Sequence, residues 1–291
     1  MAARRIGELQ ELSRFVRFVA YHPSGIGNRL SALARFVVRQ VHKRITGHPL
    51  LVGWEGFELA VGTHSTSAAA AYYLGRSDWW EFDFIERFVR PGDTVVDVGA
   101  NVGVYSLFLA KAVGPDGVVV ASEPDPENAA ALQENLSRNR LHHVRILQTA
   151  LGDHDGVAPF KAGLRTVSRF ANPGDGDTVM VRMTTLDSVL GTAEPVFVKI
   201  DVEGFEDAVI RGSRALMQRG FPKVWQLEVD ARRVEQSTRL AAALAPFGYR
   251  FLSWDPAGAR LSPCSIERAG GNNLLAAVDL DAVQARLMRA Q

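Results

Sequence analysis

Short runs of apolar residues alternate along most of this chain with segments in which apolar residues recur roughly every three or four positions. Runs of about four to eight residues are typical of buried strands, whereas the longer period is typical of helices. The runs begin near residues 94, 118, 143, 196, 222, 249 and 273. Strands that alternate with helices predict an α/β fold, with a mostly parallel sheet covered by helices on both faces.

Two segments precede this alternation. Residues 1–47 predict a helical extension with a break at 22–27, and residues 48–90 predict a cap made of a hairpin and a helix. Glycines between 53 and 56 supply the turn of the hairpin. The remainder, 91–291, is then one domain, and strands expected around 157–161 and 178–185 would overhang one end of its sheet as part of a lid.

The extension is strongly basic, with nine Lys or Arg against two Glu, a net charge of +7. Apolar residues from Leu30 to Val41 recur at helical spacing, and Arg35, Arg39 and Lys43 form a row on another face. A basic amphipathic helix can lie on an anionic membrane or bind an acidic partner. The simpler interpretation is a cap helix that packs through its apolar face and exposes its basic face to solvent.

The composition is that of an ordinary globular protein, with 47% apolar and 22% charged residues. A net charge of +1 indicates no overall attraction to nucleic acid. The single cysteine, Cys264, excludes an internal disulfide and a Cys-rich zinc site and favours the reducing cytoplasm. The sequence shows neither a signal peptide nor a run of about 18 apolar residues, so we expect a cytoplasmic protein, with peripheral contact at the inner membrane surface as the alternative.

A glycine-rich turn follows the strand at 94–98 and leads into a helix. Asp97 lies just before the turn, which spans Gly99 to Gly103. Glycine permits a turn that a Cβ atom would obstruct and lets a ligand or another segment approach closely. The Gly-x-x-x-Gly spacing differs from the Gly-x-Gly-x-x-Gly of dinucleotide-binding proteins. A plain turn between a strand and a helix remains the alternative.

Glu123 ends the second strand, 20 residues after Gly103. A carboxylate at this point can reach ribose hydroxyls, as in other nucleoside-binding α/β folds. The alternative is an acid that caps the helix after Pro124.

A second acidic turn follows the strand at 196–200. Asp201 and Glu203 lie at its carboxyl end, where open α/β sheets bind ligands, and Glu206 begins the next helix. The helix dipole accounts for Glu206 and, in the alternative interpretation, for Glu203. It does not account for Lys199, because a buried ammonium group is unfavourable unless it is paired.

Four stretches in this order resemble the FkbM family of S-adenosylmethionine (SAM) methyltransferases, over roughly residues 85–275. The stretches are Asp97–Gly103, Glu123–Pro126, Thr185–Asp187 and Lys199–Glu206. The resemblance implies a Rossmann-like class I methyltransferase fold with a seven-stranded sheet, closed by an antiparallel pair. It also implies O-methylation of a hydroxyl on a sugar, glycolipid or polyketide-like metabolite.

The resemblance implies that the two strand ends bind SAM and that adenine packs beside the turn after the third strand. The cofactor-binding candidates are Asp97, Val98, Gly99, Asn101, Gly103, Glu123, Pro124, Ala150 and Asp153. By the same resemblance, the glycine turn and the adjacent acid hold the methionine end of SAM, and there is no phosphate to bind.

Methyl transfer to an alcohol is helped by a general base, which contributes roughly 10²–10⁴-fold. The catalytic candidates are Asp201, Glu203, Glu228 and Lys199. Crowded carboxylates raise one another's pKa, which suits a base, and they could instead bind Mg²⁺. We expect no metal, and the seven histidines show no metal-ligand spacing, although His154 is an alternative base.

Three other functions are alternatives for such a chain. An NAD(P)-linked oxidoreductase lacks its glycine signature here, and nucleic-acid base methylation usually brings an Asn/Asp-Pro-Pro-aromatic tetrad that is absent. A non-catalytic SAM-binding scaffold remains open. We therefore expect a small-molecule or glycolipid acceptor and no nucleic acid. The sequence leaves the oligomeric state undetermined.

Overall fold

The structure is a computed structural model that describes residues 29–63, 65–161, 169–170, 178–229, 234–266 and 273–288. The described chain divides into two compact units, Met1–Trp79 and Trp80–Gln291. The helix expected before residue 22 and the Gly/Asp-rich loop at 174–177 lie outside the described residues.

Among its described residues, 29–63 and 65–79, the first unit contains two helices and a hairpin. They are α2 (Arg29–Thr46), β1 (Leu50–Trp54), β2 (Phe57–Val61) and α3 (Ser67–Leu74). The strands pair antiparallel from Leu50 opposite Val61 to Trp54 opposite Phe57, which confirms the predicted hairpin. Its turn is Glu55-Gly56, where both residues have positive φ and glycine is favoured at the second position.

Helix α2 reverses the expected packing. It buries Ala32, Phe36 and Arg39, whereas the apolar row that begins at Leu30 is exposed. The predicted orientation, with the apolar face packed and the basic face solvated, was therefore wrong. Within the described ranges, no helix is long and apolar enough to cross a bilayer.

The second unit is built on an eight-stranded sheet, with strand order β13-β12-β14-β11-β10-β3-β4-β5. These strands are β3 (Thr94–Val98), β4 (Val118–Ser122), β5 (Val144–Leu147), β10 (Phe197–Ile200), β11 (Val224–Leu227), β12 (Arg250–Asp255), β13 (Arg260–Pro263) and β14 (Leu274–Ala277). The five from β5 to β11 pair in parallel, and the pairings beyond β11 are antiparallel.

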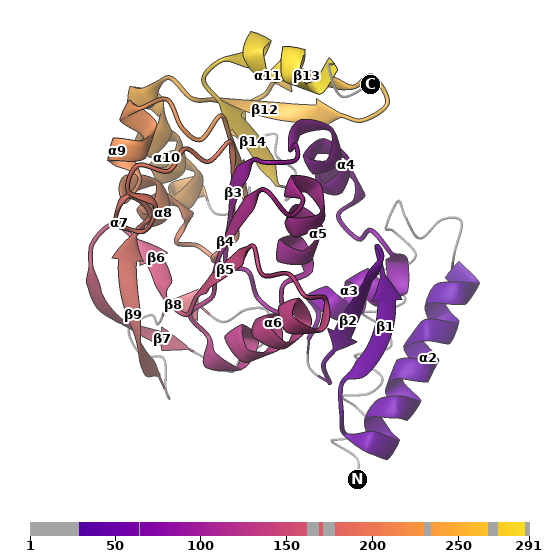
Figure 1. The fold of residues 1–291 in the computed structure, drawn as a ribbon. Coiled ribbons are helices and arrows are strands. Elements are labelled where there is room, and N and C mark those ends of the chain that lie inside the picture. Colours follow the sequence, from indigo (N-terminus) through magenta and orange to yellow (C-terminus); the bar gives the residue numbers. More distant parts are fainter. Residues whose placement is uncertain are drawn as a thin grey trace. The chain divides into compact units, whose positions relative to one another are not determined.

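Helices cover both faces of this sheet (Figure 1). They are α4 (Trp79–Phe88), α5 (Val104–Val113), α6 (Pro126–Arg138), α7 (Leu186–Leu190), α8 (Glu206–Arg211), α9 (Arg214–Gln218), α10 (Val234–Leu244), η3 (Ala245–Phe247) and α11 (Leu280–Met288). Val96 and Val198 belong to an apolar cluster with Val209 of α8. Their neighbours Asp97 and Lys199 contact α5 instead, because successive side chains of a strand point to opposite faces.

The predicted α/β fold, a mostly parallel sheet closed by antiparallel strands and covered by helices, is confirmed, with one strand more than the seven expected. The additional strand is β13, which pairs antiparallel with β12 as a hairpin at the edge of the sheet. A second sheet has the order β6-β9-β7-β8. Its strands are β6 (Ala150–Gly152), β7 (Gly156–Lys161), β8 (Arg169–Phe170) and β9 (Val179–Thr185), which confirms the two extra strands expected in this region.

Candidate functional site

The glycine turn after β3 lies directly against the acidic turn after β10. Gly99 and Gly103 have φ values of 78° and 95°, and Asn101 has 52°. A Cβ atom on Gly99 would lie 1.9 Å from the backbone carbonyl oxygen of Asp201. The glycine is therefore required by a positive φ and by close approach of the two turns, and a plain isolated turn does not describe it.

Glu123 joins the second strand end to the glycine turn. Its Oε2 accepts a hydrogen bond of 2.8 Å from the backbone N–H of Asn101, and its Oε1 accepts one of 2.9 Å from that of Asp125. Burial raises the pKa of Glu123 to about 7. The N-cap of α6 is Asp125, which accepts from two N–H groups of the first turn, so Glu123 is not the capping acid.

Asp97 is fully buried beneath the turn. The hydroxyl of Ser106 on α5 donates to its Oδ2 at 2.7 Å, and the Nζ of Lys199 lies 3.6 Å from its Oδ1. Burial raises the pKa of Asp97, although the Lys199 charge opposes the shift. Asp97 thus links the end of β3 to α5, the helix that follows the turn, and to Lys199 of β10.

Lys199 has the charged partners that its burial requires. Its side chain is 3% exposed, and Nζ lies 3.1 Å from Oδ2 of Asp201 as well as close to Asp97. The ring of Tyr105 lies 4.4 Å from Nζ. Burial alone would lower the pKa of Lys199, but the charges of Asp201 and Asp97 outweigh it and hold the pKa above its usual value.

Three carboxylates converge beside Lys199. One oxygen from each of Asp201, Glu203 and Glu228 lies within 4.8 Å of the other two. Burial, and then the charge of Asp201, raise the pKa of Glu228 to about 9. Loss of solvent around Asp201 opposes its ionisation. The charge of Lys199 and a hydrogen bond with Glu228 outweigh this effect and lower the pKa of Asp201 below its usual value. At neutral pH, Asp201 is ionised and Glu228 carries a proton.

Glu206 has a role that sequence reasoning missed. Its Oε1 accepts hydrogen bonds from the backbone N–H groups of Val202 and Gly204, and the side-chain amide of Gln236 on α10 donates to its Oε2. The side chain is buried, so these bonds hold the acidic turn in one conformation. A helix-dipole role alone would leave it exposed at the surface.

Asp187, from one of the family-like stretches, is also structural. Both of its carboxylate oxygens accept from backbone N–H groups at the start of α9, those of Ala215 and Leu216. The first N–H groups of a helix have no partner within the helix, so these hydrogen bonds cap α9 and link it to the start of α7.

The remaining cofactor candidates occupy mixed positions. Val98 is buried in the core at the end of β3, and Pro124 is partly exposed next to Glu123. Ala150 is buried in a small apolar cluster of the second sheet. Asp153 pairs with Arg211 of α8 at 2.9 Å.

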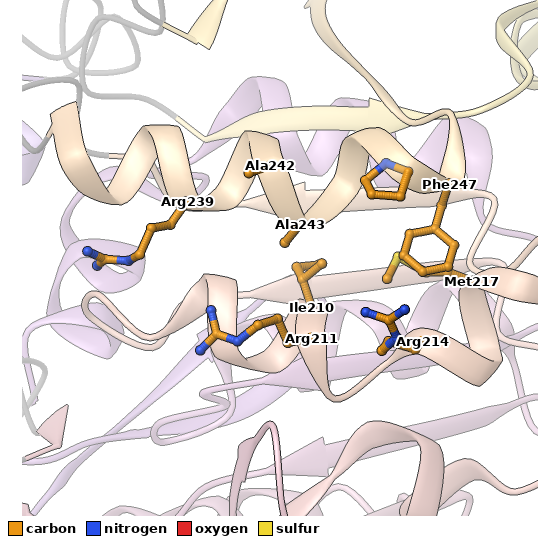
Figure 2. A pocket seen from close by; sticks show the side chains of 9 residues that line it. Ile210, Arg211, Arg214, Met217, Arg239, Ala242, Ala243 and Phe247 are labelled. Atoms are coloured by element: carbon orange, nitrogen blue, oxygen red, sulfur yellow. The ribbon is translucent and has the colours of Figure 1, made fainter.

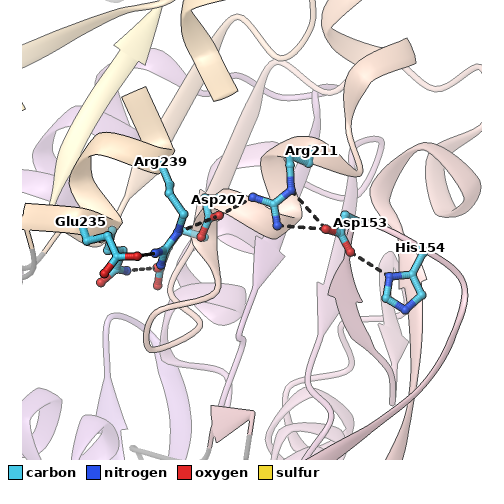
Figure 3. A network of polar contacts seen from close by, with 8 residues as sticks. Asp153, His154, Asp207, Arg211, Glu235 and Arg239 are labelled. Atoms are coloured by element: carbon cyan, nitrogen blue, oxygen red, sulfur yellow. Dashed lines mark hydrogen bonds and ion pairs between the residues drawn. The ribbon is translucent and has the colours of Figure 1, made fainter. Parts of the chain in front are cut away.

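Asp153 begins a row of alternating charges that the sequence did not suggest (Figure 3). Arg211 also pairs with Asp207, and Asp207 in turn pairs with Arg239 at 3.3 Å. His154 contacts Asp153 at 2.8 Å and is mostly exposed, which agrees with a surface histidine better than with a base in the acidic cluster.

A pocket of about 320 Å³ lies between α8–α9 and α10. Arg211, Arg214 and Arg239 project at its edge over an apolar floor (Figure 2). None of the predicted catalytic or cofactor-binding residues lines it, so this pocket is not the candidate active site.

Comparison with known proteins indicates the family of this chain. A family model described as the methyltransferase FkbM domain matches residues 97–251. The 31-O-demethyl-FK506 methyltransferase FkbM of Streptomyces tacrolimicus is 31% identical over 179 residues, which are 58% of this chain and 68% of that protein.

Two solved structures are also similar. One is a SAM-dependent O-methyltransferase from Thermotoga maritima, with a TM-score of 0.41 and 18% identity, covering 69% of this chain and 64% of that one. The other is a putative rRNA-methylase from Clostridium thermocellum, with a TM-score of 0.42 and 15% identity, covering 67% of this chain and 90% of that one.

The matched residues, 97–251, contain both the glycine turn and the acidic cluster. The chain therefore belongs to the FkbM family of SAM-dependent methyltransferases.

Proposed function

We propose that this protein transfers a methyl group from SAM to a hydroxyl of a sugar, glycolipid or polyketide-like small molecule. The observation that carries the proposal is the position of Asp201, which pairs with the buried Lys199 at 3.1 Å directly next to the glycine turn. Incubation with labelled SAM and a panel of glycosides, glycolipids and polyketides tests it. Label in an ether methyl group is expected, and label transferred only to nitrogen or carbon would contradict it.

The donors and acceptors at this edge of the sheet fit SAM. A carboxylate can accept about four hydrogen bonds, and Glu123 accepts three, from the backbone of Asn101 and Asp125 and from the side chain of Asn128. The remaining acceptor site suits a ribose hydroxyl. The proposed cofactor residues are Asp97, Val98, Gly99, Asn101, Gly103, Glu123 and Pro124, with Ala150 and Asp153 in the segment after β5 beside the adenine.

SAM supplies an already activated methyl group, so the protein mainly positions the acceptor, with the reacting atoms ~3–3.5 Å apart. We assign Asp201 the role of accepting the hydroxyl proton, because it is ionised and its side chain is 39% exposed. Lys199 is a positioning residue, since its buried ammonium keeps Asp201 ionised and oriented. Glu228 donates a hydrogen bond to Asp201, and Glu203 completes the acidic cluster.

The proton on Glu228 gives a prediction that needs no acceptor. The native state keeps this proton to about pH 9, whereas an unfolded glutamate releases it near its ordinary pKa of about 4.3. The free energy of unfolding of the wild type, compared with Glu228→Gln, is therefore expected to fall as the pH rises between these two values. Urea unfolding at a series of pH values measures the difference. A constant difference would show that Glu228 is ionised in the native state.

A divalent cation is the competing use of the acidic cluster, since three carboxylates can bind Mg²⁺. We expect enzyme treated with EDTA to retain its turnover and added Mg²⁺ to leave it unchanged, because Lys199 already neutralises Asp201. Loss of turnover on chelation that Mg²⁺ restores would instead assign the cluster to a metal.

Glu123→Gln is expected to weaken SAM binding about tenfold to a hundredfold, because a charged acceptor of ribose hydroxyls is lost. Wild-type affinity is also expected to fall below about pH 7, where Glu123 becomes protonated, and the variant should not show this dependence. Titration calorimetry measures both. Glu127→Gln, on the exposed side of the same helix start, is the matched control. Binding of NADH without binding of SAM would contradict the cofactor site altogether.

A further inference from the structure

Helix α2 exposes the face that an ordinary globular helix buries. Six large apolar side chains of α2 are between 43% and 85% exposed. They are Leu30, Leu33, Val37, Val38, Val41 and Ile45. At about 100° per residue, these positions fall on one side of the helix, opposite Ala32, Phe36 and Arg39. The exposed residues therefore form one continuous stripe.

Contacts within the first unit fix the helix in this orientation. The guanidinium group of Arg39 donates to the backbone carbonyls of Gly62, Thr63 and Ser65 and to the hydroxyl of Tyr73. The ring of Phe36 packs 5.8 Å from that of Tyr73. Rotating α2 to bury its valines would break these hydrogen bonds and leave a charged group without them, which is strongly unfavourable.

A stripe of this kind indicates a partner that supplies an apolar surface, because single exposed apolar residues are normal but contiguous patches are not. The charge of α2 indicates the chemistry of that partner. The helix carries five Arg or Lys and no Asp or Glu, and four of the five, all except the buried Arg39, are at least partly exposed. An apolar face flanked by cations is typical of helices that lie in the interface of an anionic membrane.

We infer that α2 docks the protein on an anionic phospholipid surface, with the stripe from Leu30 to Ile45 inserted among the acyl chains. A second copy of the chain would bring a second basic helix against the first. The 28 residues before α2 carry four Arg and two Glu, a net positive charge as well. Repulsion between like charges therefore disfavours both a second copy of the chain and residues 1–28 as the partner of the stripe, and it favours an anionic bilayer.

Sedimentation of the full chain with vesicles tests the inference. The wild type is expected to sediment with phosphatidylcholine vesicles that contain phosphatidylglycerol, to remain in solution with phosphatidylcholine alone, and to dissociate as salt is raised. Val37→Glu/Val41→Glu is expected to lower partitioning at least about tenfold, because two apolar groups of the stripe are lost. Thermal unfolding checks that this variant folds.

The matched control is Val157→Glu/Val179→Glu, which makes the same changes at two exposed valines of the second sheet. It is expected to partition like the wild type. Equal loss in both double variants would show that only net charge matters and would overturn the inference. A wild type that stays in solution with the anionic vesicles would also overturn the inference. Binding only after removal of residues 1–28 would identify that segment as the occupant of the stripe. A dimer that Val37→Glu/Val41→Glu dissociates would identify a second copy of the chain as the occupant. Vesicle binding does not depend on methyl transfer, so failure of one proposal leaves the other intact.

Discussion

Replacement of Asp201 by asparagine is expected to lower kcat by about 10²–10⁴-fold while SAM affinity stays close to that of the wild type. The amide keeps the size of the side chain but cannot take the proton of the acceptor hydroxyl. Turnover of the acceptor identified with labelled SAM measures the loss, and calorimetry measures cofactor binding.

Asp116→Asn, in the exposed turn after α5, is the matched control and should leave both quantities unchanged. Glu203→Gln is the informative comparison, because Glu203 belongs to the same acidic cluster as Asp201, the residue that forms an ion pair with Lys199. A larger loss of kcat in Glu203→Gln than in Asp201→Asn would transfer the role of base to Glu203. Full activity in both variants would show that neither residue is a general base and that methyl transfer depends on positioning of the acceptor alone.

Lys199→Met is expected to lower the free energy of unfolding by about 3–5 kcal/mol, which is the usual result of removing one partner from a buried ion pair. The Asp97 carboxylate has no exposed surface, so the loss of Lys199 leaves it uncompensated. Urea unfolding at pH 7 measures the change. Lys111→Met, at an exposed lysine of α5, is the control and is expected to have little effect.

The double variant Asp97→Asn/Lys199→Met separates charge from packing. It is expected to recover part of the lost stability, because the uncompensated buried carboxylate is removed together with its partner. If the double variant is as unstable as the sum of the single variants, the loss comes from the shape of the site, and the electrostatic explanation for Lys199 fails.

Much of the fold follows from local pattern. Continuous apolar runs such as 94–98 and 118–122 are typical of strands in a sheet that is buried on both faces. The glycines after β3 predict a turn with positive φ. Lys199 could be recognised as a paired residue because an ammonium in an apolar strand must find a counter-charge. These inferences need only the chain's own spacing and the energetics of burial.

Other features depend on residues that are far apart in the sequence. The sequence predicts that Glu206 acts through the helix dipole, and it shows Asp187 only as part of a family-like stretch. Each accepts backbone hydrogen bonds that exist only once neighbouring turns are in place. The pairing of Asp153 with Arg211 joins the second sheet to α8, and no local signal predicted it. The extra strand β13 is too short and too polar to be separated from loop by periodicity.

The sequence by itself determined the alternation of strands and helices, the glycine turn and the acids at two strand ends, because local geometry and burial energies operate over a few residues. The tertiary structure decided which carboxylate keeps its proton and which face of α2 is exposed. Both depend on groups brought close in space, Lys199 beside Asp201 and the loop carbonyls around Arg39, whose fields and hydrogen bonds outweigh what each residue prefers alone.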